Sequence, residues 1–250
     1  MKRTGILRVG TSGLVLPGNK QSFPKAFRNK SRLCYYSTLF NSIEINSTFY
    51  KLPLPATVAR WGTEVKPGFL FSVKMSRDIT HVKNLAYNPE DIKRFMDTVN
   101  QSDMQKGCLL IQFPGKITAD YFKQVNAILK QTAAGNVESR WKICVEFRHG
   151  SWYNAKTFSM LAKWKASVVL HDISKGAINT PGPETQVIYY RFHGPAGDYK
   201  GSYSPLQLKK YLVDIKASLK SGKDVYVYFN NTMGNAFANA QYVLKSVPVK

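Results

Sequence analysis

Val145-Glu146-Phe147-Arg148-His149-Gly150-Ser151-Trp152 is an apolar run that ends in a carboxylate, a guanidinium and an imidazole. Such an ending is typical of a strand in an α/β protein whose chemistry lies at the C-terminal ends of its strands. A second stretch, Tyr190-Arg191-Phe192-His193-Gly194, has the same form. Two strands with polar ends predict several strands that converge on one site.

Eight strands are predicted along the 250 residues, each from an apolar run or an alternating pattern bounded by turn residues. They cover residues 6–13, 42–50, 69–76, 108–113, 142–149, 167–173, 187–194 and 224–231. Helices are predicted over residues 31–40, around Trp61, and over 89–102, 119–132, 155–165, 204–221 and 235–246. This alternation predicts an α/β fold, a single (β/α)8 TIM-type barrel over 1–250, rather than an open doubly wound sheet.

The charge of the chain is strongly positive. Thirty-six Lys and Arg stand against 15 Asp and Glu, for a net charge of +21, and eight basic residues precede the first acid, Glu44. Such a field attracts anions, so nucleic acid is one possible partner and a phosphorylated small molecule is another. A solvated basic surface explains the same numbers, because the lysines are scattered over helix faces rather than gathered in a groove.

The cysteines and the hydropathy indicate a simple cytoplasmic protein. Cys34, Cys108 and Cys144 form no C-x-x-C pair, so neither a disulfide framework nor a zinc site is predicted. There is no secretory cleavage site and no segment of membrane-spanning length, and we expect no membrane partner. The sequence also has no cofactor-binding fingerprint, and it has no G-x-S-x-G, H-E-x-x-H or P-loop motif.

Alternation along each strand predicts which side chains face the barrel interior. In the strand over 142–149, apolar residues occupy the outer face, which turns Glu146 and Arg148 inward. The other expected inward pairs are Glu44 and Asn46, Ser72 and Lys74, Leu110 and Gln112, Arg191 and His193, and Tyr228 and Asn230. In the strand over 167–173, Val168 and Val169 are equally apolar, and we expect Leu170 and Asp172 inside.

Most of these polar groups lie toward the C-terminal ends of their strands, where barrel active sites are built. The candidate catalytic residues are Glu146, His193, Glu44 and Asp172, and the candidate substrate-binding residues are Asn46, Lys74, Gln112, Arg148, Arg191, Asn230 and Asn231. The alternative is a paired charge network that closes the top layer of the barrel, since buried charges need compensation.

The loops add three expectations. Asn230 to Asn235 precedes the last helix, where barrels often hold phosphate, although a simple turn and N-cap explains the same residues. The glycine-rich, aromatic loop from His193 to Tyr203 is a candidate lid. His81 follows the third strand, but a single histidine in a loop is more often incidental than functional.

Eight short motifs together resemble the YecE-like domain-of-unknown-function family (domain of unknown function 72) over about residues 7 to 245. They are Gly10-Thr-Ser-Gly13, Ile43-Glu-Ile-Asn-Ser-Thr-Phe-Tyr50, Phe71-Ser-Val-Lys74, Ile79-Thr-His81, Gln112-Phe-Pro114, Val145-Glu-Phe-Arg-His149 with Ser151-Trp152, Tyr190-Arg-Phe-His-Gly194 and Tyr228-Phe-Asn-Asn231. The resemblance implies a TIM barrel and a site at these strand ends, but no reaction. One departure is Leu14-Val15-Leu16-Pro17, where the family usually has Trp and Tyr, so the ligand here can differ.

Three functions compete. The first is a protein that binds an anionic, phosphorylated or carboxylated, small molecule; Arg148, Arg191 and Lys74 would hold it, and Glu146, Glu44 and His193 would supply acid/base chemistry. Whether the protein is an enzyme stays open. The second is a nucleic-acid-binding protein that uses its basic surface. The third is a divalent-metal enzyme that uses Glu146, Asp172 and His193, which the neighbouring Arg and Lys residues oppose, so no metal is expected.

Overall fold

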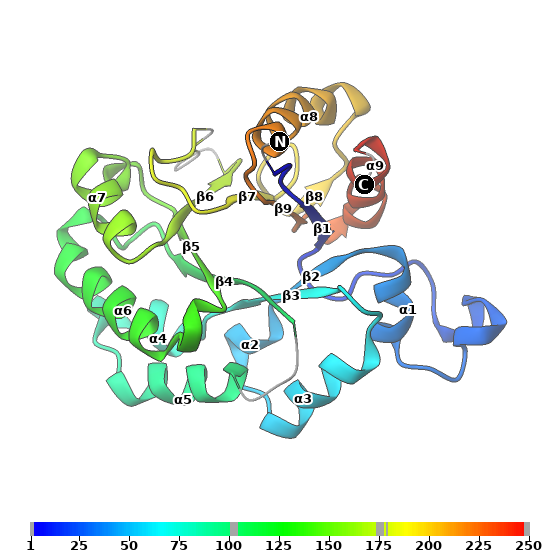
Figure 1. Ribbon diagram of the computed structural model, residues 1–250, viewed down its shortest axis with the longest axis horizontal. Coiled ribbons are helices and arrows are strands. Elements are labelled where there is room, and N and C mark those ends of the chain that lie inside the picture. Colours follow the sequence, from blue (N-terminus) through cyan, green and yellow to red (C-terminus); the bar gives the residue numbers. More distant parts are fainter. Residues whose placement is uncertain (1–2, 101–104, 174–177, 179, 248–250) are drawn as a thin grey trace.

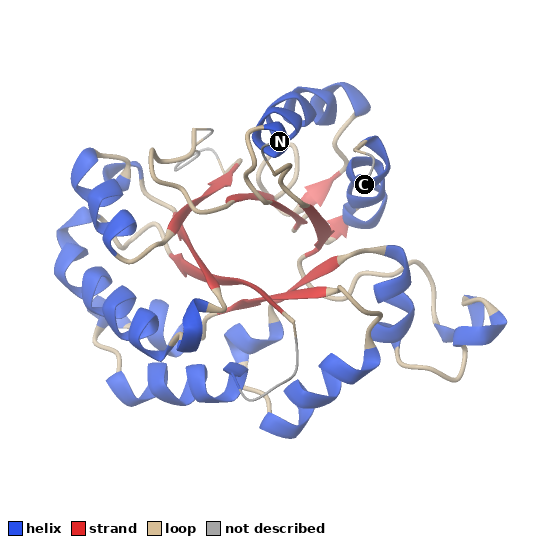
Figure 2. Ribbon diagram, in the orientation of Figure 1, coloured by secondary structure: helices blue, strands red, loops and turns tan. Residues whose placement is uncertain are grey.

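A computed structural model describes residues 3–100, 105–173, 178 and 180–247. Its main sheet has eight parallel strands in the order β1-β9-β7-β6-β5-β4-β3-β2, arranged in a ring with the helices outside it (Figures 1 and 2). The strands are β1 Leu7–Thr11, β2 Ser42–Ile45, β3 Leu70–Lys74, β4 Lys106–Phe113, β5 Lys142–Phe147, β6 Ser167–His171, β7 Ile188–Phe192 and β9 Val225–Phe229. The predicted α/β fold, a (β/α)8 TIM-type barrel, is therefore confirmed.

Helices follow most of the strands. They are α1 Arg32–Leu39, α3 Pro55–Glu64, α5 Pro89–Asn100, α6 Phe122–Gly135, α7 Ala155–Lys163, α8 Pro205–Lys220 and α9 Ala236–Ser246. Short 3₁₀ turns lie at Lys20–Ser22, Lys25–Phe27, Lys83–Leu85, Ala119–Tyr121, Val137–Ser139 and Gly150–Trp152. Capping residues fix several starts: Ser204 Oγ accepts a hydrogen bond from the backbone N–H of Gln207, and the side-chain oxygen of Gln207 accepts one from the backbone N–H of Ser204. Between β6 and β7 the described residues contain no helix.

Several local features differ from the predictions. The second strand ends at Ile45, and residues 47–50 form a short helix, α2 Ser47–Tyr50, rather than continuing the strand. Another single turn, α4 Arg77–Thr80, follows β3. A small second sheet pairs β8 Lys200–Gly201 with β10 Met233–Gly234 and was not predicted. Helix α5 ends at Asn100, and the predicted extension to residue 102 lies outside the described residues.

The barrel closes between β1 and β2 with little regular strand pairing. The side chain of Asn41 accepts a hydrogen bond from the N–H of Val9 at 2.8 Å and donates one to the carbonyl of Leu7 at 2.9 Å. Gly10 makes the close approach possible, because a Cβ there would lie 2.1 Å from the carbonyl oxygen of Ser42. Glycine at position 10 and the amide of Asn41 therefore complete the barrel.

The core has two parts. A large cluster fills the space between strands and helices, and a smaller one fills the barrel with Cys108, Leu110, Cys144, Val169, Val187, Tyr189, Tyr226 and Tyr228. Val169 belongs to the inner cluster and Leu170 to the outer one, so the predicted inward orientation of Leu170 is wrong. The alternation then turns His171 inward in place of Asp172. In the described part of the chain, no helix is long and apolar enough to cross a membrane.

Candidate functional site

A cavity of about 370 Å³ opens at the C-terminal ends of the barrel strands, and we call it the mouth cavity. Its lining residues are Ser12, Asn46, Phe49, Tyr50, Lys74, Gln112, Arg148, Arg191, Tyr199, Asn230, Thr232 and Met233. Six of the seven predicted substrate-binding residues are among them. The lining contains three basic side chains, and among the described residues it contains no carboxylate.

Two carboxylates lie buried around Arg191. Glu44 and Glu146 are fully buried, and Arg191 is 2% exposed. Arg191 donates from Nε and Nη2 to Glu44 at 3.0 to 3.1 Å, and from Nη1 to Glu146 Oε2 at 3.2 Å. Tyr189 also donates its hydroxyl to Glu44. The carboxylates therefore act as counterions of a guanidinium that spans the barrel.

Both glutamates are ionised. Burial raises the pKa of Glu44, but the charge and hydrogen bonds of Arg191 outweigh it and hold the pKa below its ordinary value. Burial also raises the pKa of Glu146, yet Arg148 and Arg191 together hold it well below the ordinary range. Because their oxygens are already hydrogen-bonded, this arrangement does not favour the acid/base role that the sequence suggested for them.

Arg148 connects this charge network to the mouth cavity. Its Nε donates to Glu146 Oε1, and its Nη2 lies 3.0 Å from His193 Nε2. The third nitrogen, Nη1, has no hydrogen-bond or ion-pair partner among the described residues. Arg148 is 12% exposed and lines the cavity, so it has a donor to offer a ligand.

His193 is buried and held from both sides. Its Nδ1 lies 3.2 Å from Asp172 Oδ1, and its Nε2 lies 2.9 Å from Arg191 Nη1. Burial, together with the nearby guanidiniums of Arg191 and Arg148, lowers the pKa of His193 to about 4. The neutral ring therefore donates from Nδ1 and accepts at Nε2. Both nitrogens are occupied, so a proton-shuttle role requires the network to rearrange.

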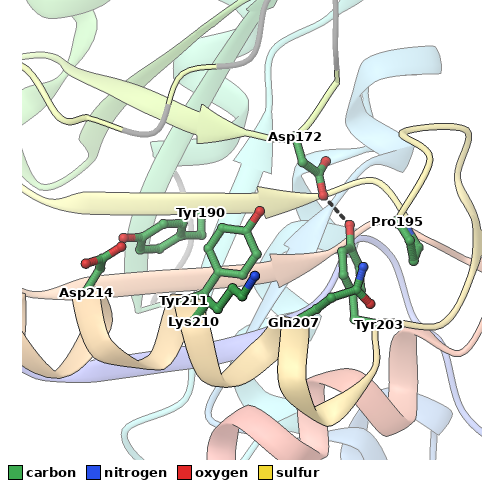
Figure 3. Close-up of a pocket in the computed structure, with 8 residues that line it drawn as sticks. All are labelled: Asp172, Tyr190, Pro195, Tyr203, Gln207, Lys210, Tyr211 and Asp214. Atoms are coloured by element: carbon green, nitrogen blue, oxygen red, sulfur yellow. Dashed lines mark hydrogen bonds between the residues drawn. The ribbon is translucent and has the colours of Figure 1, made fainter.

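Asp172 faces a different cavity. This outer cavity, about 340 Å³, lies between β7 and α8 and is lined by Asp172, Tyr190, Pro195, Tyr203, Gln207, Lys210, Tyr211 and Asp214 (Figure 3). Tyr203 donates its hydroxyl to Asp172 Oδ2, as the dashed line shows. Asp172 is absent from the described lining of the mouth cavity. Among the described residues, Asp172 is connected to the mouth cavity through its hydrogen bonds with His193.

Lys74 is the basic residue of the mouth cavity that has no carboxylate partner. It is 8% exposed at the end of β3, and its Nζ lies 3.9 Å from the centroid of the Phe49 ring. Neither a hydrogen bond nor an ion pair of Nζ is found among the described residues. Its backbone carbonyl accepts a hydrogen bond from Thr48 Oγ1 at 2.7 Å, which fixes the strand end.

The sequence missed several residues of the site. Phe49 lies on the unexpected helix α2, and Tyr199 reaches the cavity from the loop after β7. His171 is 3% exposed, and its ring centroid lies 6.1 Å from that of His193. Placing Val169 rather than Val168 on the inner face of β6 would have predicted His171 on that face too. His81, which we expected to be incidental, lies 3.4 Å from Gln112 Nε2 and packs edge-on against Phe49.

The loops after β7 and β9 are joined to each other. Asn231 is fully buried, and its Nδ2 donates to the carbonyl of Gly201 and to Asn239 Oδ1, both at 3.0 Å. It does not appear in the described lining of the mouth cavity, and its side chain links the two loops. The N–H of Met233 donates to the carbonyl of Tyr199 at 3.1 Å, which ties the candidate lid to the loop after β9.

The arrangement of acidic groups does not suit a metal ion. Among the described residues, no group of three or more His, Cys, Asp or Glu side chains is placed to hold one. In the predicted alternative trio of Glu146, Asp172 and His193, Glu146 is paired with Arg148 and Arg191, and Asp172 accepts hydrogen bonds from Tyr203 and from the N–H of His193. The two guanidinium groups beside Glu146 oppose a cation at this position.

Comparisons with known proteins show a consistent fold. A family described as "Protein of unknown function DUF72" matches residues 8–250. A DUF72 family protein from Thermotoga maritima is similar in structure, with TM-score 0.70, 24% identity, and coverage of 96% of this chain and 98% of that one. One from Enterococcus faecalis has TM-score 0.72 and 19% identity, and covers 97% of both chains.

A more distant barrel shares only the fold. The AP endonuclease, family 2, from Brucella melitensis has TM-score 0.59 and 9% identity, with coverage of 100% of both chains. A search of the curated proteins gave no match.

Proposed function

This chain belongs to the DUF72 family of proteins of unknown function, and from that premise we propose that it binds an anionic small molecule in the mouth cavity. The observation that carries the proposal is the composition of the lining. Lys74, Arg148 and Arg191 contribute three basic groups, and the described lining has no carboxylate to oppose them. A volume of about 370 Å³ is within the range of cavities that hold metabolites.

The basic groups have different tasks. The guanidinium of Arg191 is already hydrogen-bonded to Glu44 and Glu146, so its main contribution is a positive electrostatic potential in the cavity. Arg148 Nη1 and Lys74 Nζ have no hydrogen-bond or ion-pair partner among the described residues, and they supply the charge-assisted hydrogen bonds to a phosphate or carboxylate group. Glu146 holds the guanidinium of Arg148 in place.

Neutral groups complete the site. Gln112 and Asn230 line the cavity with amide groups that can donate or accept hydrogen bonds. The side-chain oxygen of Asn46 is buried and has no hydrogen-bond partner in the described part of the chain. A buried acceptor without a partner is costly, so it suits a ligand that brings a hydroxyl or N–H group beside its anionic end.

Calorimetric titration with inorganic phosphate tests this proposal. The wild type is expected to bind at one saturable site, and Arg148→Gln to bind about 10- to 100-fold more weakly, because one charge-assisted hydrogen bond is lost. Arg60→Gln is the matched control, since it removes the same charge from an exposed position on α3. Equal loss in both variants, or no saturable binding by the wild type, would contradict the proposal.

A further inference from the structure

Lys74 differs from the other buried cations of the barrel. Arg191 and Arg148 each contact a buried glutamate, whereas Lys74 Nζ faces the Phe49 ring at 3.9 Å and meets no acidic oxygen among the described residues. A lysine whose only task is structural is normally paired when it is buried this deeply. The unpaired ammonium therefore calls for another explanation.

The surroundings of Lys74 oppose its positive charge. Burial, together with the charges of Arg191 and Arg148, lowers the pKa of Lys74 to about 7 against the opposing pull of Glu146 and Glu44. The oxygens of those two glutamates are committed to guanidinium groups. At neutral pH a lysine with a lowered pKa carries a neutral amine, with a free lone pair, far more often than a lysine in water.

The position of this amine suits attack on a bound molecule. Lys74 lies in the same cavity lining as Arg148, and its backbone is held by β3 and by Thr48. An anion held by Arg148 would bring the rest of its structure beside Nζ. Proximity of this kind turns a slow reaction between two molecules into a fast one within a complex.

We propose that Lys74 is a nucleophile that forms an imine with the carbonyl group of an anionic aldehyde, ketone or keto acid bound in the mouth cavity. This inference rests on the proposed anion site for its substrate class. Lysine amines near other cations or in apolar pockets are activated in this way.

The reaction needs no further reagent. The lone pair of Nζ forms a bond to the carbonyl carbon as the C=O π bond breaks and the oxygen takes up a proton. The second step expels that oxygen as water and forms the C=N bond. Both hydrogens of the neutral amine leave in the water molecule, so atoms and electrons balance.

Reductive trapping tests the inference. The protein is incubated at pH 7 with sodium cyanoborohydride and either glyoxylate, an anionic carbonyl compound, or propionaldehyde, a neutral one, and the labelled lysines are identified by peptide mass spectrometry. Exposed Lys51 serves as the internal comparison. Lys74 is expected to react with propionaldehyde at least about tenfold faster than Lys51, because far more of its amine is neutral at this pH.

The pH profile separates a nucleophile from a simple anion-binding ammonium. Labelling of Lys74 is expected to rise with pH and to level off above about 7. Lys74→Arg keeps a cation at this position but has no nucleophilic amine, so it should lose the fast label. A propionaldehyde rate at Lys74 no greater than at Lys51 would overturn the inference.

The two probes keep the two proposals apart. If Lys74 reacts rapidly with both probes but Arg148→Gln does not slow glyoxylate more than propionaldehyde, then the nucleophile stands and the anion site fails. If phosphate binds saturably and Lys74 is unreactive, the anion site stands and the nucleophile fails.

Discussion

Arg191 donates to both carboxylate oxygens of Glu44, although the two residues lie 147 positions apart on β7 and β2. The pair is almost wholly buried and links two walls of the barrel. The ion pair with Glu44 holds Arg191 in a position where it also contacts Glu146. Glu146 in turn holds Arg148 beside the mouth cavity. The buried charge network is therefore continuous with Arg148, which lines the mouth cavity.

Replacing Arg191 should unfold the protein more easily. Arg191→Met leaves Glu44 and Glu146 buried with fewer partners, so we expect a loss of about 3–5 kcal/mol in the free energy of unfolding, measured by urea denaturation. Arg94→Met, at an exposed position on α5, should change it by less than about 0.5 kcal/mol. Similar stability of the two methionine variants would contradict this prediction.

The barrel could be predicted because its signals are local. Each strand is an apolar run of adequate length, and Ser31 and Ser204 mark helix starts with their side chains. The sixth strand was the exception, since Val168 and Val169 are equally apolar and give no preferred face. The inward side chain was therefore predicted as Asp172 when it is His171.

Closure of the barrel predicts a strong effect at Gly10. Gly10→Ala places a methyl group 2.1 Å from the carbonyl oxygen of Ser42, which is backbone and cannot turn aside. We expect β1 and β2 to separate, with a loss of about 1–3 kcal/mol measured by thermal unfolding. Gly150→Ala is a suitable control, because no atom lies within 4 Å of the added carbon there. A Gly10→Ala protein as stable as the control would refute this account of closure.

His193 should stay neutral at mildly acidic pH. Its pKa is lowered to about 4 by burial and by Arg191 and Arg148, against the pull of Asp172 and Glu146. In the unfolded chain it takes up a proton near pH 6.5, so stability is present above that pH and is lost as the pH falls toward 4. The lowered pKa of His193 is expected to contribute about 3 kcal/mol to the free energy of unfolding above that pH. Ring NMR signals checked from pH 8 to 4 should show no titration of His193 near 6.5; a midpoint there would contradict the prediction.

Depth in the barrel could not be predicted from the alternation. The alternation places both Glu44 and Lys74 on the inner face. It does not show that Glu44 is buried beneath Arg191 whereas Lys74 reaches the mouth cavity. Depth depends on the relative stagger of neighbouring strands, which is set by tertiary pairing. Phe49 was missed, and Tyr199 was expected only as part of a candidate lid, because both lie on segments whose path depends on the finished barrel.

Binding of nucleic acid through the net charge should be separable from the mouth cavity. Any binding of duplex DNA should weaken steeply with salt, because it depends on many phosphate contacts. Arg148→Gln and Arg60→Gln should weaken it equally, as each removes one of many charges. A much larger loss in Arg148→Gln, in binding assays at fixed salt, would indicate that the mouth cavity itself holds a nucleic-acid phosphate.

Anomalous diffraction from crystals soaked in tungstate, an oxyanion that resembles phosphate, tests the central claim most directly. The account predicts the strongest anomalous peak inside the mouth cavity, within hydrogen-bond reach of Arg148 Nη1 and Lys74 Nζ, and its loss in crystals of Arg148→Gln. An empty mouth cavity, with tungstate bound only at exposed lysines, would contradict it.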